Sequence, residues 1–558
     1  MSGSRENTLP EAPAGVPPRR PAPAGTTRVR PTLVLALALA LAVLAGCAVG
    51  PSQRPPVAVR GELLPAAPPP AAAAPPAEPD LLPAPEPVRG GPVFTDCTAD
   101  VLAGLTAAGT PVPAGRALEV GCGQLTVPAD RSRPDLGPAR LGLTRVRAPG
   151  APEDLPALVV LGDTALDGSA RTAADLSARL PTGVLQRFQV IGMDRRGTGE
   201  DLLDCAPTEA RAALLDAGPD RRDEAAMTGL LERSRSIVQD CYLLLSGTLA
   251  SFRSGSTADD VESLRSALGL ARLNLLGVGD GADAAAGWAA RHPDAVGRVV
   301  LDGPGDPTLD DPARTEAATA AAESAFDAFA TACTARPDCP LGPDPRAAVR
   351  GLLGGLADTP MPVGDGDAVT AGATVRAIRW VLAQPSRWPE LQAALAAARA
   401  GDPAGLVRLL APVGGPQGRF DAALATRCND SRVRATPGEA AARAAEWAGR
   451  FPLFGVAAAQ DLVACGPWPS GGPVAPSTPP GAGTPDDSPP VLVLGTAQDP
   501  RSPQSGAERT AEQLADGRVV RWEGAGTGAY PRTPCVTAVV DRALVEGRAP
   551  AAPVVCPP

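Results

Sequence analysis

From about residue 97 onward, short apolar runs alternate with segments of helical periodicity. Eight runs have the length of strands, and several are uninterrupted apolar stretches, which are typical of parallel strands buried on both faces. Strands that alternate with helices predict an α/β fold with a doubly wound, mostly parallel, eight-stranded sheet. The eight runs are CGQLTVPA (122–129), ARLGLTRVRA (139–148), ALVVLG (157–162), FQVIGMD (188–194), LNLLGVG (273–279), GRVVLDG (297–303), PPVLVLG (489–495) and GRVVRWEG (517–524).

One of the helical segments is STADDVESLRSALGL, residues 256–270. Ser256 followed by Asp259 is close to a capping box, which predicts that this helix begins directly after Ser256. A much longer segment, 307–488, breaks the alternation because it is rich in alanine, helical and interrupted by proline loops. It is too long for one crossover helix. We therefore expect a helical cap inserted between two parts of the sheet domain, 93–306 and 489–558.

The N-terminal region has the pattern of an export signal. The stretch 32–45 is apolar and follows several arginines, but it is shorter than the ~20 residues that span a bilayer. It ends in LAGC, which resembles the lipobox of bacterial lipoproteins and implies that Cys47 is lipidated. We expect a signal peptide at 1–46, a Pro/Ala-rich tether at 47–92 and an extracytoplasmic protein anchored to the outer face of the cell membrane. The alternative is an uncleaved anchor helix.

Export changes the interpretation of the other ten cysteines, because exported proteins commonly form disulfides. The even number favours a complete disulfide framework, and no C-x-x-C redox motif occurs. Their order suggests that neighbours along the chain pair, although the sequence permits other connectivities. The expected pairs are Cys97–Cys122, Cys205–Cys241, Cys333–Cys339, Cys428–Cys465 and Cys535–Cys556.

The composition excludes several kinds of chemistry. The chain contains no lysine and a single histidine, His292, so lysine-based catalysis and multi-histidine metal sites are excluded. Its formal net charge is −10 and it has no basic stripe, which argues against nucleic acid as a partner. The stretch GDGDAV at 364–369 lacks the ligand spacing of an EF-hand and predicts an exposed turn. We expect no cofactor and no bound metal.

Several stretches, in a fixed order, resemble a known family. They are FQVIGMDRRGTGED (188–201), STADDVESLRSALGLARLNLLGVGDG (256–281), RHPDAVGRVVLDGPGDP (291–307), VLVLGTAQDPRSP (491–503) and GAGTGAYPRTPCVTAVVDRALVEGRAP (524–550). Together they resemble the secreted tripeptidyl aminopeptidase-like hydrolases of actinobacteria, over roughly residues 94–556. The resemblance implies the α/β-hydrolase fold and a catalytic triad in the order nucleophile, acid, histidine.

The family motifs locate three triad positions in this chain. GVGDG at 277–281 matches the nucleophile elbow G-x-S-x-G, with Gly279 in place of serine. The acid position matches Asp499, and the histidine position, in GAGTG, matches Thr527. The glycine-rich oxyanion loop of the family corresponds to LGDTALDG at 161–168. Losing a triad member costs about 10⁴- to 10⁶-fold in rate, so these matches imply a pseudoenzyme.

Other uses of the same fold remain open. Asp280 could serve as a carboxylate nucleophile in a rewired, active site with Asp499, although Val278 and Ala282 flank it less favourably than the glycines flank Gly279. His292 lies about three helical turns beyond the elbow, where it would interact with the helix dipole. The expected cleft between cap and sheet would bind a peptide or an apolar small molecule, or contact an envelope partner. A structural envelope protein with a filled cleft is the third alternative.

Overall fold

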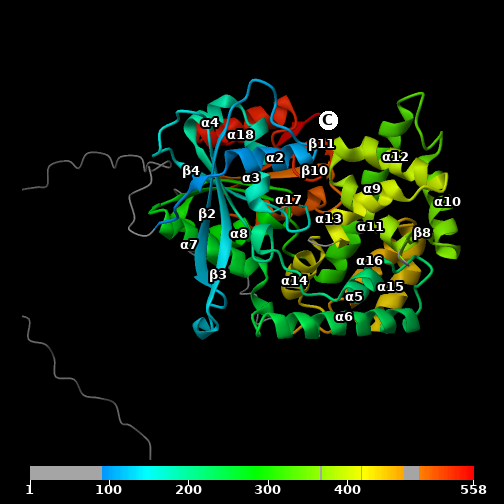
Figure 1. Ribbon diagram of the computed structural model, residues 1–558. Helices are drawn as coiled ribbons and strands as arrows, with labels where there is room; N and C mark the ends of the chain where they lie inside the picture. Colours follow the sequence, from blue (N-terminus) through cyan, green and yellow to red (C-terminus); the bar gives the residue numbers. More distant parts are fainter. Residues whose placement is uncertain (1–90, 167, 365–366, 416–417, 470–488) are drawn as a thin grey trace, which may run out of the picture. The chain divides into compact units, whose positions relative to one another are not determined.

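The computed structural model describes residues 91–166, 168–364, 367–415, 418–469 and 489–558 (Figure 1). Every described residue belongs to one compact unit, Glu78–Pro558. The expected signal peptide, Cys47 and the tether up to residue 90 lie outside the described residues. Within the described ranges, no helix is both long enough and apolar enough to cross a membrane.

All eight apolar runs form strands of one ten-stranded sheet. Two short edge strands that the hydrophobic pattern did not indicate complete it, β1 (Thr95–Asp96) and β12 (Val554–Cys556). The eight expected strands are β2 (Glu119–Pro128), β3 (Pro138–Arg147), β4 (Ala157–Leu161), β5 (Gln189–Met193), β6 (Leu273–Val278), β7 (Val296–Asp302), β10 (Val491–Gln498) and β11 (Gly517–Ala525).

The strands lie in the order β1-β2-β3-β5-β4-β6-β7-β10-β11-β12. Neighbours pair antiparallel from β1 to β5 and parallel from β5 to β12. This is the strand order of the α/β-hydrolase fold. The order reverses at β4, which has β5 on one side and β6 on the other. Because ligands bind beside such a switch point, the loops that follow β4 and β6 mark the expected site.

Helices cover both faces of the sheet, and each face has its own apolar cluster. On one face, the cluster joins the strands to α2 (Thr98–Ala107), α3 (Ser169–Arg179), α4 (Thr182–Arg187) and α18 (Pro534–Glu546). On the other face, it joins them to α7 (Ser254–Ala267), α8 (Asp280–Arg291) and α17 (Gln504–Glu512). Strand β4 is buried along its whole length, as its continuous apolar sequence predicts.

Helix α7 begins earlier than expected, so the predicted capping box at Ser256 is wrong. The helix starts at Ser254, and Ser256 lies inside it with its side chain buried. The backbone N–H and the hydroxyl of Ser254 donate to Asp430, at 3.1 and 2.7 Å. A partner 176 residues away in the sequence thus satisfies the first turn of the helix, and no local cap is needed.

The segment from 311 to 463 is helical and lies beside the carboxyl edge of the sheet, as expected for a cap (Figure 1). Four of the six residues of GDGDAV lie in an antiparallel strand pair, β8 (Met361–Gly364) and β9 (Asp367–Val369), and the expected turn itself, 365–366, lies outside the described residues. The domain boundaries themselves stay a prediction. The cap helices are α9 (Asp311–Thr334), α10 (Pro345–Asp358), α11 (Ala371–Leu382), α12 (Trp388–Arg399), α13 (Ala404–Gly414), α14 (Phe420–Asp430), α15 (Pro437–Arg450) and α16 (Gly455–Val463).

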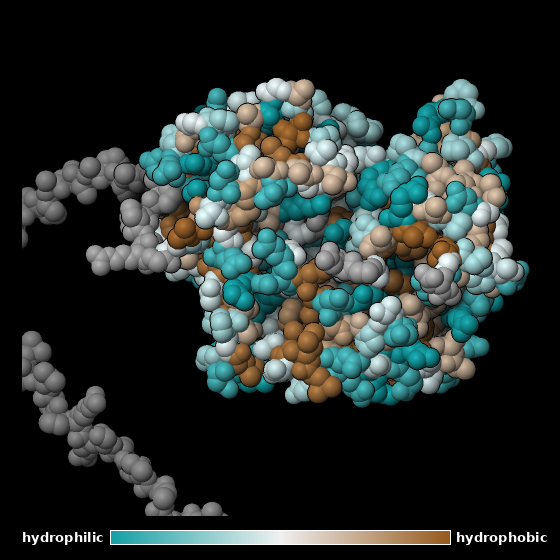
Figure 2. Space-filling model, in the orientation of Figure 1, coloured by the Kyte–Doolittle hydropathy of each residue, from teal (hydrophilic) through white to brown (hydrophobic). Residues whose placement is uncertain are grey.

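Two further helices join this layer from an earlier part of the chain. Helices α5 (Thr208–Leu215) and α6 (Glu224–Leu244) share an apolar cluster with α14, α15 and α16. Figure 1 shows α6 beside α15 and α16. The helical layer is therefore built from the predicted insertion and from a segment that precedes the elbow. On the face in Figure 2, hydrophilic residues alternate with smaller hydrophobic patches over both the sheet side and the helical side.

The five expected disulfides are confirmed, each between neighbours along the chain. Their Cα–Cα separations, from 4.8 to 5.8 Å, are ordinary for disulfides. Five disulfides are consistent with an extracytoplasmic protein. The pairs are Cys97–Cys122, Cys205–Cys241, Cys333–Cys339, Cys428–Cys465 and Cys535–Cys556.

Candidate functional site

The turn between β6 and α8 keeps the backbone of a nucleophile elbow. Gly279 has φ 59° and ψ −128°, a conformation that favours glycine. Its neighbours in the motif are glycines because the backbone is crowded: a Cβ on Gly277 would lie 2.6 Å from Cα of Ala282, and a Cβ on Gly281 would lie 2.4 Å from the carbonyl oxygen of Leu161. The resemblance of GVGDG to an elbow thus extends to its geometry.

The carboxylate of Asp163 occupies the space that a side chain at position 279 would need. A Cβ on Gly279 would lie 2.2 Å from Oδ2 of Asp163 and 2.9 Å from its Cβ. Asp163 follows β4 and is only 3 % exposed. Its carboxylate accepts hydrogen bonds from the backbone N–H of Ala165 at 2.9 Å and of Asp280 at 3.2 Å. A nucleophile cannot be accommodated here unless Asp163 moves.

Arg501 holds Asp163 in this position. It follows β10, two residues after Asp499, and donates from Nη2 to both carboxylate oxygens of Asp163, at 2.9 and 3.1 Å. Burial alone would lower the pKa of the Arg501 guanidinium, but the surrounding carboxylates, Asp163 first among them, raise it. The result is a charge-assisted, bidentate ion pair between two loops at the carboxyl edge of the sheet.

Asp280, the alternative nucleophile, is the first residue of α8 and is also bound to protein groups. Its Oδ1 lies 2.6 Å from Nη1 of Arg195, and it accepts hydrogen bonds from the Thr164 backbone N–H at 2.9 Å and from the Thr164 hydroxyl. Burial raises the pKa of Asp280, while the positive charge of Arg195 opposes that shift. A carboxylate so occupied is a poor nucleophile.

The structure brings Asp499 and Thr527 together, as their assignment to the acid and histidine positions requires. The Thr527 hydroxyl donates to Oδ1 of Asp499 at 2.6 Å, and the backbone N–H of Arg501 donates to the same oxygen at 2.9 Å. Oδ2 of Asp499 has no hydrogen-bond partner among the described residues. Because Asp499 is completely buried, its pKa is raised to about 7.

His292 lies at the opposite end of α8 from the elbow. The twelve residues of the helix correspond to roughly 18 Å. Nδ1 of His292 is 3.9 Å from Oε2 of Glu262, and its ring lies near that of Trp288. His292 is therefore too far away to contact Asp499 or Asp280, and no histidine lies in the described part of the site.

A cavity of about 410 Å³ lies between the elbow and the cap. Asp163, Thr164 and Asp280 line it from the sheet side, and Trp380 and Phe454 contribute apolar surface from the cap. The indole N–H of Trp380 donates to the carbonyl oxygen of Ala165 at 3.0 Å, which joins the cap to the loop after β4. The lining also contains arginines, so the cavity is more highly charged than an apolar cleft.

The interpretation of the sequence missed three residues that define this site: Asp163, Arg195 and Arg501. All three lie in quoted stretches, LGDTALDG, FQVIGMDRRGTGED and VLVLGTAQDPRSP. The signal was present in the first stretch, where an aspartate stands in a loop that is glycine-rich in the family. The pairing of Asp163 with Arg501 was not visible, since 338 residues separate them.

The comparisons with known proteins agree with this architecture. The family described as "TAP-like protein" matches residues 451–556. "Carboxylesterase B" of Mycobacterium tuberculosis is 29 % identical over 467 residues, which cover 78 % of this chain and 86 % of that protein. "Serine protease Hip1" of Mycobacterium tuberculosis is 30 % identical over 41 % of this chain and 44 % of its own length. "Tripeptidyl aminopeptidase" of Streptomyces coelicolor is 26 % identical over 40 % of this chain and 39 % of its own length.

Solved structures resemble the chain more distantly. A hydrolase from Pseudomonas aeruginosa has a TM-score of 0.31 at 17 % identity, covering 76 % of this chain and 98 % of its own. A proline iminopeptidase from Mycobacterium smegmatis has a TM-score of 0.30 at 15 % identity, with the same two coverages. These scores carry no weight in the assignment, which rests on the strand order, the elbow and the sequence relatives. On that basis, the chain has the α/β-hydrolase fold and is similar to the tripeptidyl aminopeptidase-like hydrolases of actinobacteria.

Proposed function

We propose that this protein is a lipid-anchored, extracytoplasmic member of its family that has lost serine hydrolysis and uses its cavity to bind a ligand. The observation that carries the proposal is the Asp163 carboxylate, which lies where the nucleophile side chain would stand. The loss is thus more than an absent serine. The space has been taken by a buried ion pair with Arg501.

The remaining groups do not supply another route for acyl transfer. Thr527 is hydrogen-bonded to Asp499, but its hydroxyl is far too weak a base at neutral pH to activate a nucleophile. Asp499 is buried and has no imidazole to orient. The loss of even one triad member lowers the rate by about 10⁴- to 10⁶-fold.

The two alternatives have less support. A rewired hydrolase would need Asp280 as nucleophile, and its carboxylate is held by Arg195 and Thr164. A structural envelope protein would need a filled cleft, whereas a cavity of about 410 Å³ lies within the usual range of ligand sites, about 300–1,000 Å³. We therefore favour binding of a peptide or small molecule, with the protein attached to the membrane through Cys47.

Labelling with a fluorophosphonate probe tests the proposed loss of activity. The purified protein should remain unlabelled under conditions in which an active tripeptidyl aminopeptidase is labelled to completion. A panel of peptide and ester substrates extends the test to mechanisms that do not use serine. Labelling of the wild-type protein, or hydrolysis that disappears in Asp280→Asn, would overturn the proposal.

A further inference from the structure

The cap side of the cavity carries more positive charge than its carboxylates neutralise. Arg376, Arg379 and Arg427 surround Asp461, whose carboxylate oxygens lie 3.5, 3.9 and 3.4 Å from their guanidinium nitrogens. All four side chains line the cavity. Asp461 is the only described carboxylate within 4.0 Å of these three arginines. Burial alone would raise its pKa, but the three arginines hold that pKa below the ordinary value.

These three arginines differ in what else they bind. Arg376 donates to the carbonyl oxygens of Leu215 and Ala217, both at 3.1 Å, so it also holds α5 against α11. Arg379 donates no hydrogen bond to any residue that the structure describes. Burial lowers its pKa to about 10, which leaves it charged at neutral pH. Its side chain is 27 % exposed and lines the cavity, and its ion pair with Asp461 is long, so Arg379 has the capacity to bind an anion from outside the protein.

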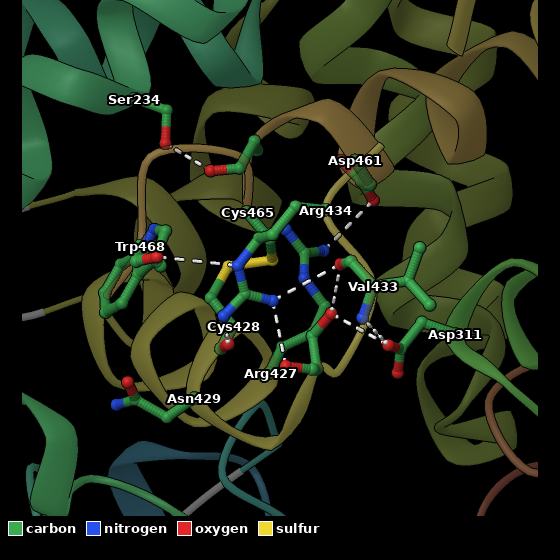
Figure 3. Close-up of a disulfide and its surroundings, with 12 residues drawn as sticks. Ser234, Asp311, Arg427, Cys428, Asn429, Val433, Arg434, Asp461, Cys465 and Trp468 are labelled. Carbon is green, nitrogen blue, oxygen red and sulfur yellow. Dashed lines mark hydrogen bonds and ion pairs between the residues drawn. A yellow bond between two sulfur atoms is a disulfide. The ribbon is translucent and has the colours of Figure 1, made fainter. Parts of the chain in front are cut away.

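The position of Arg427 is fixed by its neighbour in the chain. Figure 3 shows that Cys428 forms the disulfide with Cys465, which lies one helical turn beyond Asp461. The disulfide thus ties the arginine and the aspartate to one another through their own helices. Arg427 is 46 % exposed, so part of its guanidinium remains available to a ligand.

We propose that the cavity binds a small anionic ligand whose carboxylate or phosphate group pairs with Arg379 and is flanked by Arg427. Guanidinium groups match the planar oxygen pairs of both anions. Trp380 and Phe454 line the same cavity and would contact an apolar part of the ligand. Arg501 lines the same cavity, but its charge is paired with Asp163 at the elbow. The anion would therefore lie on the cap side of the cavity. This inference rests on the proposed binding function and specifies its ligand class.

Isothermal titration of the full-length protein tests the proposal with four probes: inorganic phosphate, succinate, trialanine and trialanine amide. We expect the wild-type protein to bind phosphate or a carboxylate at millimolar concentrations or below. Arg379→Gln should weaken that binding roughly 10-fold or more, because a charge-assisted hydrogen bond is lost. Trialanine bound in preference to its amide identifies a carboxylate as the ligand group, whereas phosphate bound alone identifies phosphate.

Matched variants separate a local effect from misfolding. Arg399→Gln removes an exposed arginine from cap helix α12 and should leave affinity unchanged. Arg427→Gln changes a half-exposed residue and should weaken binding several-fold without loss of thermal stability. Failure of every probe to bind the wild-type protein, or equal affinity in Arg379→Gln, would reject the anion site. Equal affinity for trialanine and trialanine amide, unchanged in Arg379→Gln, would reject the anion site while leaving the proposed binding function in place.

Discussion

The hydroxyl of Thr527 lies 2.6 Å from Oδ1 of Asp499, across a separation of 28 residues in the sequence. The contact occupies the place where the family resemblance puts an imidazole beside its acid. Two positions assigned from separate motifs therefore meet in space, which supports both assignments. The residues of this site can be tested one by one.

Rebuilding the triad should require more than the two missing side chains. Gly279→Ser with Thr527→His restores the nucleophile and the histidine, but the introduced serine side chain would collide with the carboxylate of Asp163. We expect fluorophosphonate labelling only when Asp163→Gly and Arg501→Gln are added, which empties the space and avoids an unpaired buried arginine. Equal labelling of the double variant, with Asp163 retained, would show that Asp163 does not block the site.

Breaking the ion pair at one end should destabilise the fold. Asp163→Ala leaves Arg501 without its bidentate partner at a largely buried position, which costs about 3–5 kcal/mol of unfolding free energy. Adding Arg501→Met should recover much of that loss. Urea titrations measure both changes, and Glu512→Ala, which breaks an exposed pair with Arg509, serves as the control with no measurable effect. A stable Asp163→Ala single variant would contradict the importance of the pair.

Stability should fall as the pH rises through the weakly acidic range. Burial raises the pKa of Asp499 from 3.8 to about 7, so between these values the folded protein keeps a proton that the unfolded chain has lost. The unfolding free energy then decreases with rising pH, by at most about 1.4 kcal/mol per pH unit for each such group, and levels off above pH 7.

Asp283 and Asp302 also have raised pKa values, about 7 and about 6, and change the stability in the same direction. The variant Asp499→Asn is therefore needed to separate the contribution of Asp499 from theirs. The variant should show a shallower slope between pH 4 and 7 in urea titrations, while Asp154→Asn at an exposed site should keep the wild-type slope. Parallel slopes for wild type and Asp499→Asn would show that Asp499 is ionised in the folded protein.

Removing the disulfide between Cys428 and Cys465 should weaken both the fold and the proposed anion site. Replacing both cysteines with alanine opens a loop of 37 residues, which corresponds to about 3–4 kcal/mol in the chain-entropy model. The same change at Cys333 and Cys339 opens a much shorter loop and should cost about 2 kcal/mol. Only the first variant should also reduce affinity for the anion probes, since only that disulfide adjoins Arg427.

Membrane attachment is expected to depend on Cys47. Cys47→Ser should block lipidation and move the protein from the membrane fraction to the soluble fraction, or stop its maturation. Mass spectrometry of the mature N-terminus gives an independent reading, because a diacylated cysteine adds a characteristic mass. A Cys47→Ser protein that is processed and retained as before would assign the anchor to another segment.

The fold could be predicted from the sequence because its buried strands are continuous apolar runs, such as Ala157–Leu161. Such a run indicates a buried strand without knowledge of the segments that pack against it. The elbow could be predicted because close backbone approach allows only glycine at Gly277 and Gly281. Interactions between distant segments were not predictable. Neither the pairing of Asp163 with Arg501 nor the role of Asp430 at the start of α7 leaves a local pattern, and nothing in α6 indicates that it packs with the cap.

The connectivity of the disulfides has a consequence for how the chain oxidises. Each disulfide joins two cysteines that are consecutive along the chain. If the chain is exported with its N-terminal end first, each pair is complete before the next cysteine emerges. The native pairs could then form in order, without thiol–disulfide exchange. Cys47 is the one cysteine that would disturb this order, because as a free thiol it would meet Cys97 before Cys122 does. Lipidation at Cys47 would remove that competitor.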